Sequence, residues 1–288
     1  MSFERERIET PDGDFLDLDW VHNTLNLNGS GRVVVLLHGL EGCSERAYMR
    51  GMTKVLSAAG WTVCALNFRS CSGELNRLPR SYHSGVTEDL KTVLSAISDR
   101  YEHVCAAGFS LGGNVLLKYL GEEGGGSKIE AAVAISTPCD LKGSAEKLEL
   151  ESNRKYMRRF LRSLSAKMEA KSRLFPEQIC VDDFESIRSF RAFDDRYTAP
   201  LHGFDDAEDY WRRCSSKSFL KHITIPTAIL TAKDDPFLSE SCYPEEEARL
   251  NSNVFLDTPR FGGHLGFYNR NTFWSERQVV KFLGEAIS

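Results

Sequence analysis

A serine flanked by glycines is the first feature of the sequence that could do chemistry. The stretch Gly108-Phe109-Ser110-Leu111-Gly112 follows an apolar run and precedes a helix-prone run. A sharp turn from a strand into a helix leaves no room for side chains two residues before and after its apex, and it exposes the hydroxyl at the apex. The N-terminus of the next helix favours negative charge that develops beside it. This pattern predicts an α/β-hydrolase fold in which Ser110 is a nucleophile.

A serine hydroxyl needs a base, and the fold restricts which histidine can serve. In this fold the catalytic residues follow the chain order serine, acid, histidine, and the histidine comes after the last strand. The sequence holds seven histidines, and only His264, in RFGGHLGF, follows the last strand-like run. Gly262 and Gly263 would let the loop bend toward the sheet. We therefore expect His264 to accept the Ser110 proton.

The acidic partner of this histidine is expected just after the seventh strand-like run. The stretch TAKDDPFL offers Asp235, which is followed by a proline and two apolar residues. Its carboxylate would accept a hydrogen bond from His264 and stabilise the protonated ring. Adjacent side chains cannot both point at one histidine, so Asp234 is a rival, and Asp140 is a third candidate. We predict Asp235 and leave the other two open.

Two backbone amides complete the predicted site. The stretch HGLEG (38–42) follows the third strand-like run, where this fold supplies one donor to the tetrahedral oxyanion. The second donor belongs to the residue after the nucleophile. We therefore expect an oxyanion hole made by the backbone N–H groups of Leu40 and Leu111. The His38 side chain is expected to bond loop backbone and not substrate.

Short apolar runs alternate with helix-prone stretches over most of the chain, which is typical of βαβ units around a parallel sheet. The start differs, because ERERIETPDGDFLDLDWV alternates around Pro11-Asp12-Gly13 and predicts an antiparallel hairpin. We expect a sheet of about eight mostly parallel strands with helices on both faces. Buried strands are predicted at 32–39, 62–68, 103–109, 130–136, 227–232 and 253–258, and helices at 44–59, 84–97, 110–119 and 272–286. His83-Ser84 is expected to cap the second of these helices.

The segment between Asp140 and Lys221 lacks a buried strand and is charged and helix-prone. We predict a helical cap at 141–221, inserted into one α/β-hydrolase core made of 1–140 and 222–288. Within it, residues 150–173 carry apolar side chains at helical spacing, surrounded by lysines and arginines. This pattern favours a lid helix with solvated charges over the alternative, peripheral contact with an anionic membrane.

The composition of the chain argues against several classes of function. The chain has 288 residues and a formal net charge of −5, which argues against nucleic-acid binding. Its eight cysteines include no C-x-x-C pair, and the start, MSFERERIET, lacks the apolar core of a signal peptide. We expect a reduced, cytoplasmic protein with no metal or cofactor. The sequence does not indicate an oligomeric state.

Several stretches together are more specific than any of them alone: HGLEG (38–42), NFRSCSGELNR (67–77), YHSGVTEDL (82–90), GFSLGGN (108–114), TAPLHGF (198–204), DDPF (234–237) and GGHLGF (262–267). In these stretches the chain resembles the YheT-like hydrolases, which are related to animal α/β-hydrolase-domain lipases and plant embryogenesis-associated proteins. The resemblance implies a triad of Ser110, Asp235 and His264 and hydrolysis of carboxylic esters, with acylglycerols or phospholipids as substrates of some members. One departure is Ser70, where the family often has glycine.

The expected function is therefore that of a serine hydrolase that cleaves small acyl esters, lipids among them, through an acyl-enzyme intermediate. An acyltransferase or a thioesterase would use the same triad with another acceptor or leaving group. A non-catalytic relative that only binds a ligand is the alternative from a different class, although such proteins usually lose a triad member.

Overall fold

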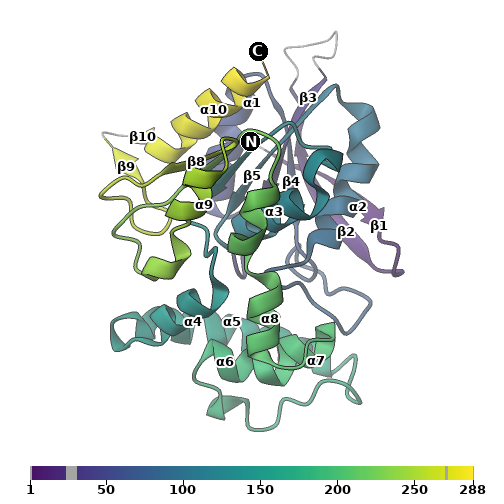
Figure 1. Cartoon of the computed structure of the whole chain (residues 1–288). Helices are drawn as coiled ribbons and strands as arrows, with labels where there is room; N and C mark the ends of the chain where they lie inside the picture. Colours follow the sequence, from purple (N-terminus) through teal and green to yellow (C-terminus); the bar gives the residue numbers. More distant parts are fainter. Residues whose placement is uncertain (1, 24–30, 270–271, 288) are drawn as a thin grey trace.

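An eight-stranded sheet forms the centre of the computed structural model, which describes residues 2–23, 31–269 and 272–287 (Figure 1). The strand order is β1-β2-β4-β3-β5-β6-β7-β8. The first strand pairs antiparallel with the second and the second antiparallel with the fourth, while the remaining pairs are parallel. The strands are β1 (Glu4–Glu9), β2 (Phe15–Val21), β3 (Arg32–Leu37), β4 (Thr62–Asn67), β5 (His103–Phe109), β6 (Ala131–Ile135), β7 (Thr227–Leu230) and β8 (Val254–Asp257).

Helices cover both faces of this sheet (Figure 1). Because side chains alternate along a strand, β3 sends Val33 and Val35 into one apolar cluster and Val34 and Leu36 into the other. The first cluster is completed by α2 (Thr87–Ile97) and α3 (Leu111–Glu123), and the second by α1 (Ala47–Ala58) and α10 (Trp274–Ala286). Burial on both sides explains why these strands are continuous apolar runs in the sequence. The fold class predicted from the sequence is confirmed.

The predicted strands and helices agree with the structure to within a few residues, except where a helix begins. The helix predicted from Ser44 begins at Ala47, and Ser44 donates a 2.5 Å hydrogen bond to Asp19 instead. The helix predicted from Ser84 begins at Thr87 without any side-chain cap. The backbone N–H of Ser84 donates to the Tyr210 hydroxyl at 2.9 Å. The expected capping by His83-Ser84 is therefore wrong, because tertiary contacts hold this stretch in a non-helical conformation.

The chain between β6 and β7 is helical and lies below the sheet in the view of Figure 1. Its longest helix, α5, buries its apolar stripe of Met157, Leu161, Leu164 and Met168. The helices are α4 (Leu141–Glu149), α5 (Arg154–Ser172), α6 (Phe190–Phe193), α7 (Ala199–His202) and α8 (Ala207–Cys214). The inward stripe favours a lid over a membrane-facing helix, and the division of the chain into a core and a cap stays a prediction.

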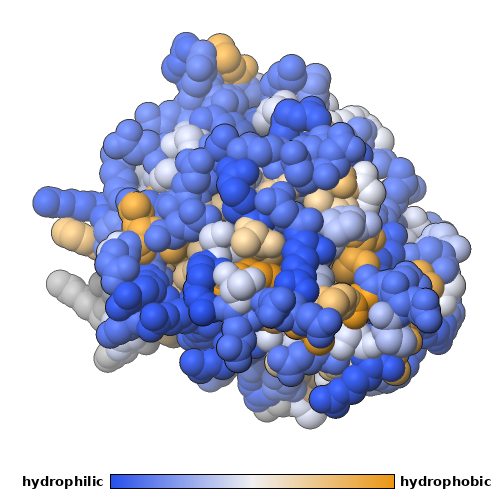
Figure 2. Space-filling view, turned by 90° about the horizontal axis from the view of Figure 1, so that it is seen from below, coloured by the Kyte–Doolittle hydropathy of each residue, from blue (hydrophilic) through white to orange (hydrophobic). Residues whose placement is uncertain are grey.

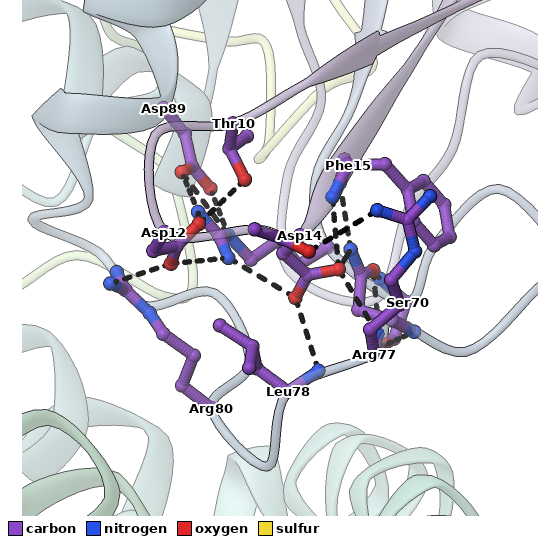
Figure 3. Close-up of polar contacts among 12 residues, drawn as sticks. Thr10, Asp12, Asp14, Phe15, Ser70, Arg77, Leu78, Arg80 and Asp89 are labelled. Carbon is purple, nitrogen blue, oxygen red and sulfur yellow. Dashed lines mark hydrogen bonds and ion pairs between the residues drawn. The ribbon is translucent and has the colours of Figure 1, made fainter.

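A buried ionic network fixes the loop after β4, whose far end contacts α5. Arg69 reaches the carboxylates of Asp89 at 2.7 Å, Asp12 at 2.9 Å and Asp14 at 3.2 Å. Figure 3 shows these carboxylates, from the β1–β2 turn and from α2, converging on this loop. Lys171 of α5 donates to the carbonyl groups of Leu78, Pro79 and Arg80 at 2.7 to 3.2 Å. The loop therefore connects the sheet edge to the helices below it.

Candidate active site

Ser110 lies at the apex of the turn from β5 into α3. Its backbone has φ +52° and ψ −117°, a conformation that non-glycine residues rarely adopt. A Cβ on Gly112 would lie 2.5 Å from the Leu37 carbonyl oxygen, and one on Gly108 would lie 2.5 Å from the Gly112 carbonyl oxygen. These contacts give the physical reason for glycine on both sides of the serine.

The structure brings the three predicted side chains together. Ser110 Oγ lies 3.0 Å from His264 Nε2, and His264 Nδ1 lies 2.8 Å from Asp235 Oδ2 and 3.0 Å from its Oδ1. Because a carboxylate can only accept, Nδ1 carries the ring proton and Nε2 is left to accept from the serine hydroxyl. Asp235 Oδ1 also accepts the Phe237 backbone N–H at 2.9 Å, which restrains the carboxylate. The Asp235 side chain is fully buried.

The two rival carboxylates have other partners. Asp234 Oδ1 accepts the backbone N–H groups of Gly262 and Gly263, each at 2.8 Å. These residues immediately precede His264, and Gly263 has φ +56°, a conformation that suits glycine. Asp140 is the N-cap of α4 and accepts the Gly143 N–H at 3.3 Å. Of the three candidates, only Asp235 contacts the histidine.

The loop that carries Leu40 passes directly beside the nucleophile. A Cβ on Gly39 would lie 3.3 Å from the Ser110 Cβ. The N–H of Gly39 donates to the Tyr48 hydroxyl at 3.0 Å, and that of Glu41 donates to the Tyr82 hydroxyl at 2.6 Å. Within the described part of the chain, the Leu40 and Leu111 N–H groups have no such acceptor, and both residues line the pocket that contains Ser110. The two amides are therefore left available for a ligand oxygen.

His38 supports this loop from behind. Its Nε2 accepts the Phe68 N–H at 3.1 Å, so Nδ1 carries the proton and donates to the Gly39 carbonyl at 2.8 Å. Burial lowers the pKa of His38 to about 3, so the ring is neutral. The side chain is fully buried and does not line the pocket, which confirms that it bonds loop backbone.

One pocket contains both Ser110 and His264. Its walls come from the loop after β3, from the start of α3 and from α4 to α8, and they are mostly apolar. The Phe237 ring contacts the His264 ring at a tilt of 43°, with 4.3 Å between ring centroids. Figure 2 shows the face formed by the helices below the sheet, where apolar side chains lie between polar ones. The apolar lining side chains include Leu148, Phe160, Leu164, Met168, Phe190, Phe193 and Leu201.

Two lysines of α5 that we expected to be solvated are buried, and this expectation is wrong. Lys167 Nζ lies 2.6 Å from Glu41 Oε1 and 3.2 Å from Cys71 Sγ, and it sits over the Tyr82 ring. Lys171 is fully buried on its backbone acceptors. Their positions, three and seven residues after Leu164, place them on the apolar face of the helix, and this spacing was a signal available in the sequence.

Ser70 has φ +61°, a backbone conformation that a glycine would adopt without strain. Its backbone N–H and its Oγ both bond Asn76, at the other side of the same loop. The side-chain contact to Asn76 holds the loop in this conformation despite the strain.

Comparison with known sequences agrees with this geometry. The family described as alpha/beta hydrolase fold matches residues 32–270, so the chain belongs to the α/β-hydrolase family. YheT of Escherichia coli (strain K12) is 39% identical over 286 residues, which cover 96% of this chain and 84% of that protein. Human phospholipase ABHD3 is 32% identical over 294 residues, which cover 98% of this chain and 72% of that protein. The resemblance to YheT-like hydrolases is thereby confirmed.

Solved structures show the same fold. The esterase Pf2001 of Pyrococcus furiosus superposes with a TM-score of 0.68 at 19% identity, covering all of this chain and 91% of the esterase. Among the sequence relatives, YheT bears the name of an esterase and ABHD3 that of a phospholipase, and the chain falls in the class of carboxylic-ester hydrolases. None of the helices that the structure describes is long and apolar enough to cross a membrane. Among the described residues, no three or more histidine, cysteine, aspartate or glutamate side chains are grouped so that they could hold a metal ion.

Proposed function

We propose that the chain hydrolyses carboxylic esters by a Ser110–His264–Asp235 mechanism. Ser110 Oγ attacks the ester carbonyl carbon while His264 Nε2 takes the hydroxyl proton. The negative charge that develops on the carbonyl oxygen is stabilised by the Leu40 and Leu111 N–H groups. Collapse of the tetrahedral intermediate breaks the bond to the alcohol, which leaves with the proton from His264, and the acyl group remains on Ser110.

Water then completes the reaction. It attacks the acyl carbon and gives its proton to His264, which returns a proton to Ser110 Oγ as the acid is released. Asp235 keeps the imidazole in the tautomer that both steps require and stabilises the imidazolium. The single observation that carries this proposal is the continuous chain of contacts from Asp235 through His264 to Ser110.

The apolar lining of the pocket supports an acyl chain as the group bound beside Ser110. Transfer of each buried CH₂ group from water is worth about 0.8 kcal/mol. We propose that residues 141–221 act as a cap that supplies much of this lining. The name of the human relative, a phospholipase, supports a lipid among the natural esters.

The experiment that tests this proposal is turnover of p-nitrophenyl esters of increasing acyl length by wild-type protein, Ser110→Ala and His264→Ala. We expect wild-type turnover, and a loss of three to six orders of magnitude in both variants, in line with triad substitutions in other serine hydrolases. Product analysis with added alcohol separates hydrolysis from acyl transfer, and a matched thioester tests for a thioesterase. Wild-type protein without turnover of any ester would favour a ligand-binding relative.

Peripheral contact with an anionic membrane is a separate proposal, and it rests on a different observation. Arg154, Lys155, Arg158, Arg159 and Arg162 of α5 point away from the buried stripe and are mostly exposed, with Tyr156 43% exposed among them. Such side chains would attract anionic lipid. We expect more protein to sediment with anionic than with neutral vesicles, and equal binding to both would exclude the membrane contact.

A further inference from the structure

Two histidines that the triad does not use line the same pocket as Ser110. His83 belongs to the loop before α2, and His202 is the last residue of α7. Their rings contact edge to face, with 4.6 Å between centroids, and the His83 ring also contacts Phe204 and Tyr210. Both lie in motifs singled out in the sequence, YHSGVTEDL and TAPLHGF. The structure therefore joins two stretches that the triad does not use at one wall of the pocket.

The loop of His83 is anchored close to the nucleophile's helix. Asn114, in the first turn of α3, donates to the Ser84 carbonyl at 2.7 Å and to the Cys214 carbonyl at 2.8 Å. The Ser84 N–H donates to the Tyr210 hydroxyl. These contacts fix the position of the His83 ring relative to the helix that begins at Ser110.

Hydrogen bonding sets which nitrogen of His83 carries the proton. The Gly85 backbone N–H donates to His83 Nδ1 at 3.1 Å, so Nδ1 is an acceptor and the proton of the neutral ring is on Nε2. His83 is a buried residue, with a relative exposure of 8%. No acceptor for Nε2–H occurs among the described residues, and the His202 ring likewise has no hydrogen-bond partner there. His83 Nε2 is not one of the buried atoms that lack a partner, and because the residue lines the pocket, its N–H is open to a ligand oxygen there.

The surroundings favour an uncharged ligand group. Burial lowers the pKa of His83 to about 3 and that of His202 to about 2, so both rings are neutral at physiological pH. Among described residues that line the pocket, the only lysine or arginine is Lys167, and it is already paired with Glu41. Asp194, a carboxyl group, lines the pocket as well. An anionic group would therefore enter without a free cation to offset its desolvation.

We propose that His83 and His202 form a subsite that binds an uncharged hydroxyl group of the ester substrate. This rests on the proposed ester hydrolysis at Ser110. A hydroxyl is both a donor and an acceptor, so its oxygen can accept from His83 Nε2–H while its hydrogen donates to the unprotonated nitrogen of His202. An alkyl chain would satisfy neither ring. The hydroxyl can belong to the alcohol part or to the acyl part of the ester.

The test compares kcat/KM for four esters of equal length. The first is butyl hexanoate. The other three are the same ester with a terminal hydroxyl on the butyl chain, with a terminal hydroxyl on the hexanoyl chain, and with a terminal carboxylate on the hexanoyl chain. We expect wild-type protein to prefer one hydroxylated ester over butyl hexanoate by about tenfold, the value of a neutral hydrogen bond in a buried site. The preferred ester identifies which part of the substrate carries the hydroxyl. The carboxylate ester should be the poorest.

In the variants His83→Phe and His202→Phe, the ratio of kcat/KM for the preferred hydroxylated ester to kcat/KM for butyl hexanoate should fall close to one. Both variants should still hydrolyse butyl hexanoate. His222→Phe is the matched control, because His222 is exposed and does not line the pocket, and it should keep the preference. If His83→Phe does not fold, His202→Phe at the more open position carries the test alone. Hydroxylated esters that are no better than butyl hexanoate, a preference for the carboxylate, or a preference that both variants retain would overturn the subsite. Failure to hydrolyse any ester would instead overturn the proposed function.

Discussion

Asp234 and Asp235, adjacent in the sequence, hold the same histidine by different groups. Asp235 accepts from the imidazole of His264, and Asp234 accepts from the backbone of the two glycines before it. Successive side chains after β7 thus orient the ring and its loop separately. The ring needs a carboxylate for its charge, whereas the loop needs only an oxygen acceptor.

Substitutions of Asp234 and Asp235 should therefore have different effects on kcat. Asp235→Asn should lower kcat by about four orders of magnitude, because an amide can stabilise the wrong imidazole tautomer. Asp234→Asn keeps an acceptor oxygen and should stay within about threefold of wild type, whereas Asp234→Ala should lose about a hundredfold by misplacing the ring. Steady-state kinetics on one p-nitrophenyl ester measures all three. Equal losses in Asp234→Asn and Asp235→Asn would contradict the separate roles.

The Lys167–Glu41 ion pair should couple the stability of α5 to activity. Lys167→Met leaves a largely buried carboxylate without its partner, and we expect a loss of about 3 kcal/mol in the free energy of unfolding. Because Glu41 follows Leu40, kcat should fall as well. Lys155→Met, at an exposed position of the same helix, should change neither. Urea denaturation and steady-state kinetics provide the two readouts, and a stable, fully active Lys167→Met protein would refute the coupling.

Close packing at the turn from β5 into α3 gives a prediction about stability. Gly112→Ala would place a Cβ 2.5 Å from the Leu37 carbonyl oxygen, and backbone on both sides prevents relief. We expect a loss of about 3 kcal/mol, at the upper end of overpacking penalties. Gly125→Ala is the control, because nothing lies within 4 Å of its added Cβ. Thermal unfolding monitored by circular dichroism compares the two, and similar melting temperatures would show that the turn can relax.

Buried Asp194 should impose a pH dependence on stability. Burial raises its pKa from 3.8 to about 7, and the carboxyl accepts hydrogen bonds from Thr198 at 2.6 Å and Trp211 at 2.9 Å. Since the folded pKa lies above the unfolded one, the stability due to the protonated carboxyl is fully present below about pH 4 and is lost as the pH rises through about 7. Each unit of displacement corresponds to about 1.4 kcal/mol.

Asp194→Asn removes this titration while keeping an acceptor oxygen. Its stability relative to wild type should therefore increase between pH 4 and pH 8, as measured by unfolding at several pH values. A difference that does not change with pH would contradict the raised pKa.

Local patterns predicted much of the fold and the candidate site. The turn around Ser110 was predictable because contacts close to that turn require its glycines. The parallel strands were predictable because burial on both faces requires apolar runs. Position alone singled out His264, since only one histidine follows β8. The choice of Asp235 over Asp234 depended on the turn after β7, which is again local.

Contacts between distant segments were not predictable. The pairing of Lys167 with Glu41 depends on how α5 lies against the loop after β3, and the meeting of His83 with His202 depends on where α7 ends. The start of α2 was placed too early for the same reason, because Tyr210 of α8 holds the Ser84 backbone. Helical spacing places Lys167 on the apolar face of α5, but it does not tell which residue of another segment Lys167 contacts.

Labelling with a fluorophosphonate probe, followed by peptide mass mapping, tests most directly whether the hydroxyl at position 110 is an activated nucleophile. The mechanism predicts one covalent adduct, on Ser110, with no labelling of Ser110→Ala and much slower labelling of His264→Ala. A wild-type protein that stays unlabelled, or an adduct on another residue that persists in Ser110→Ala, would contradict it.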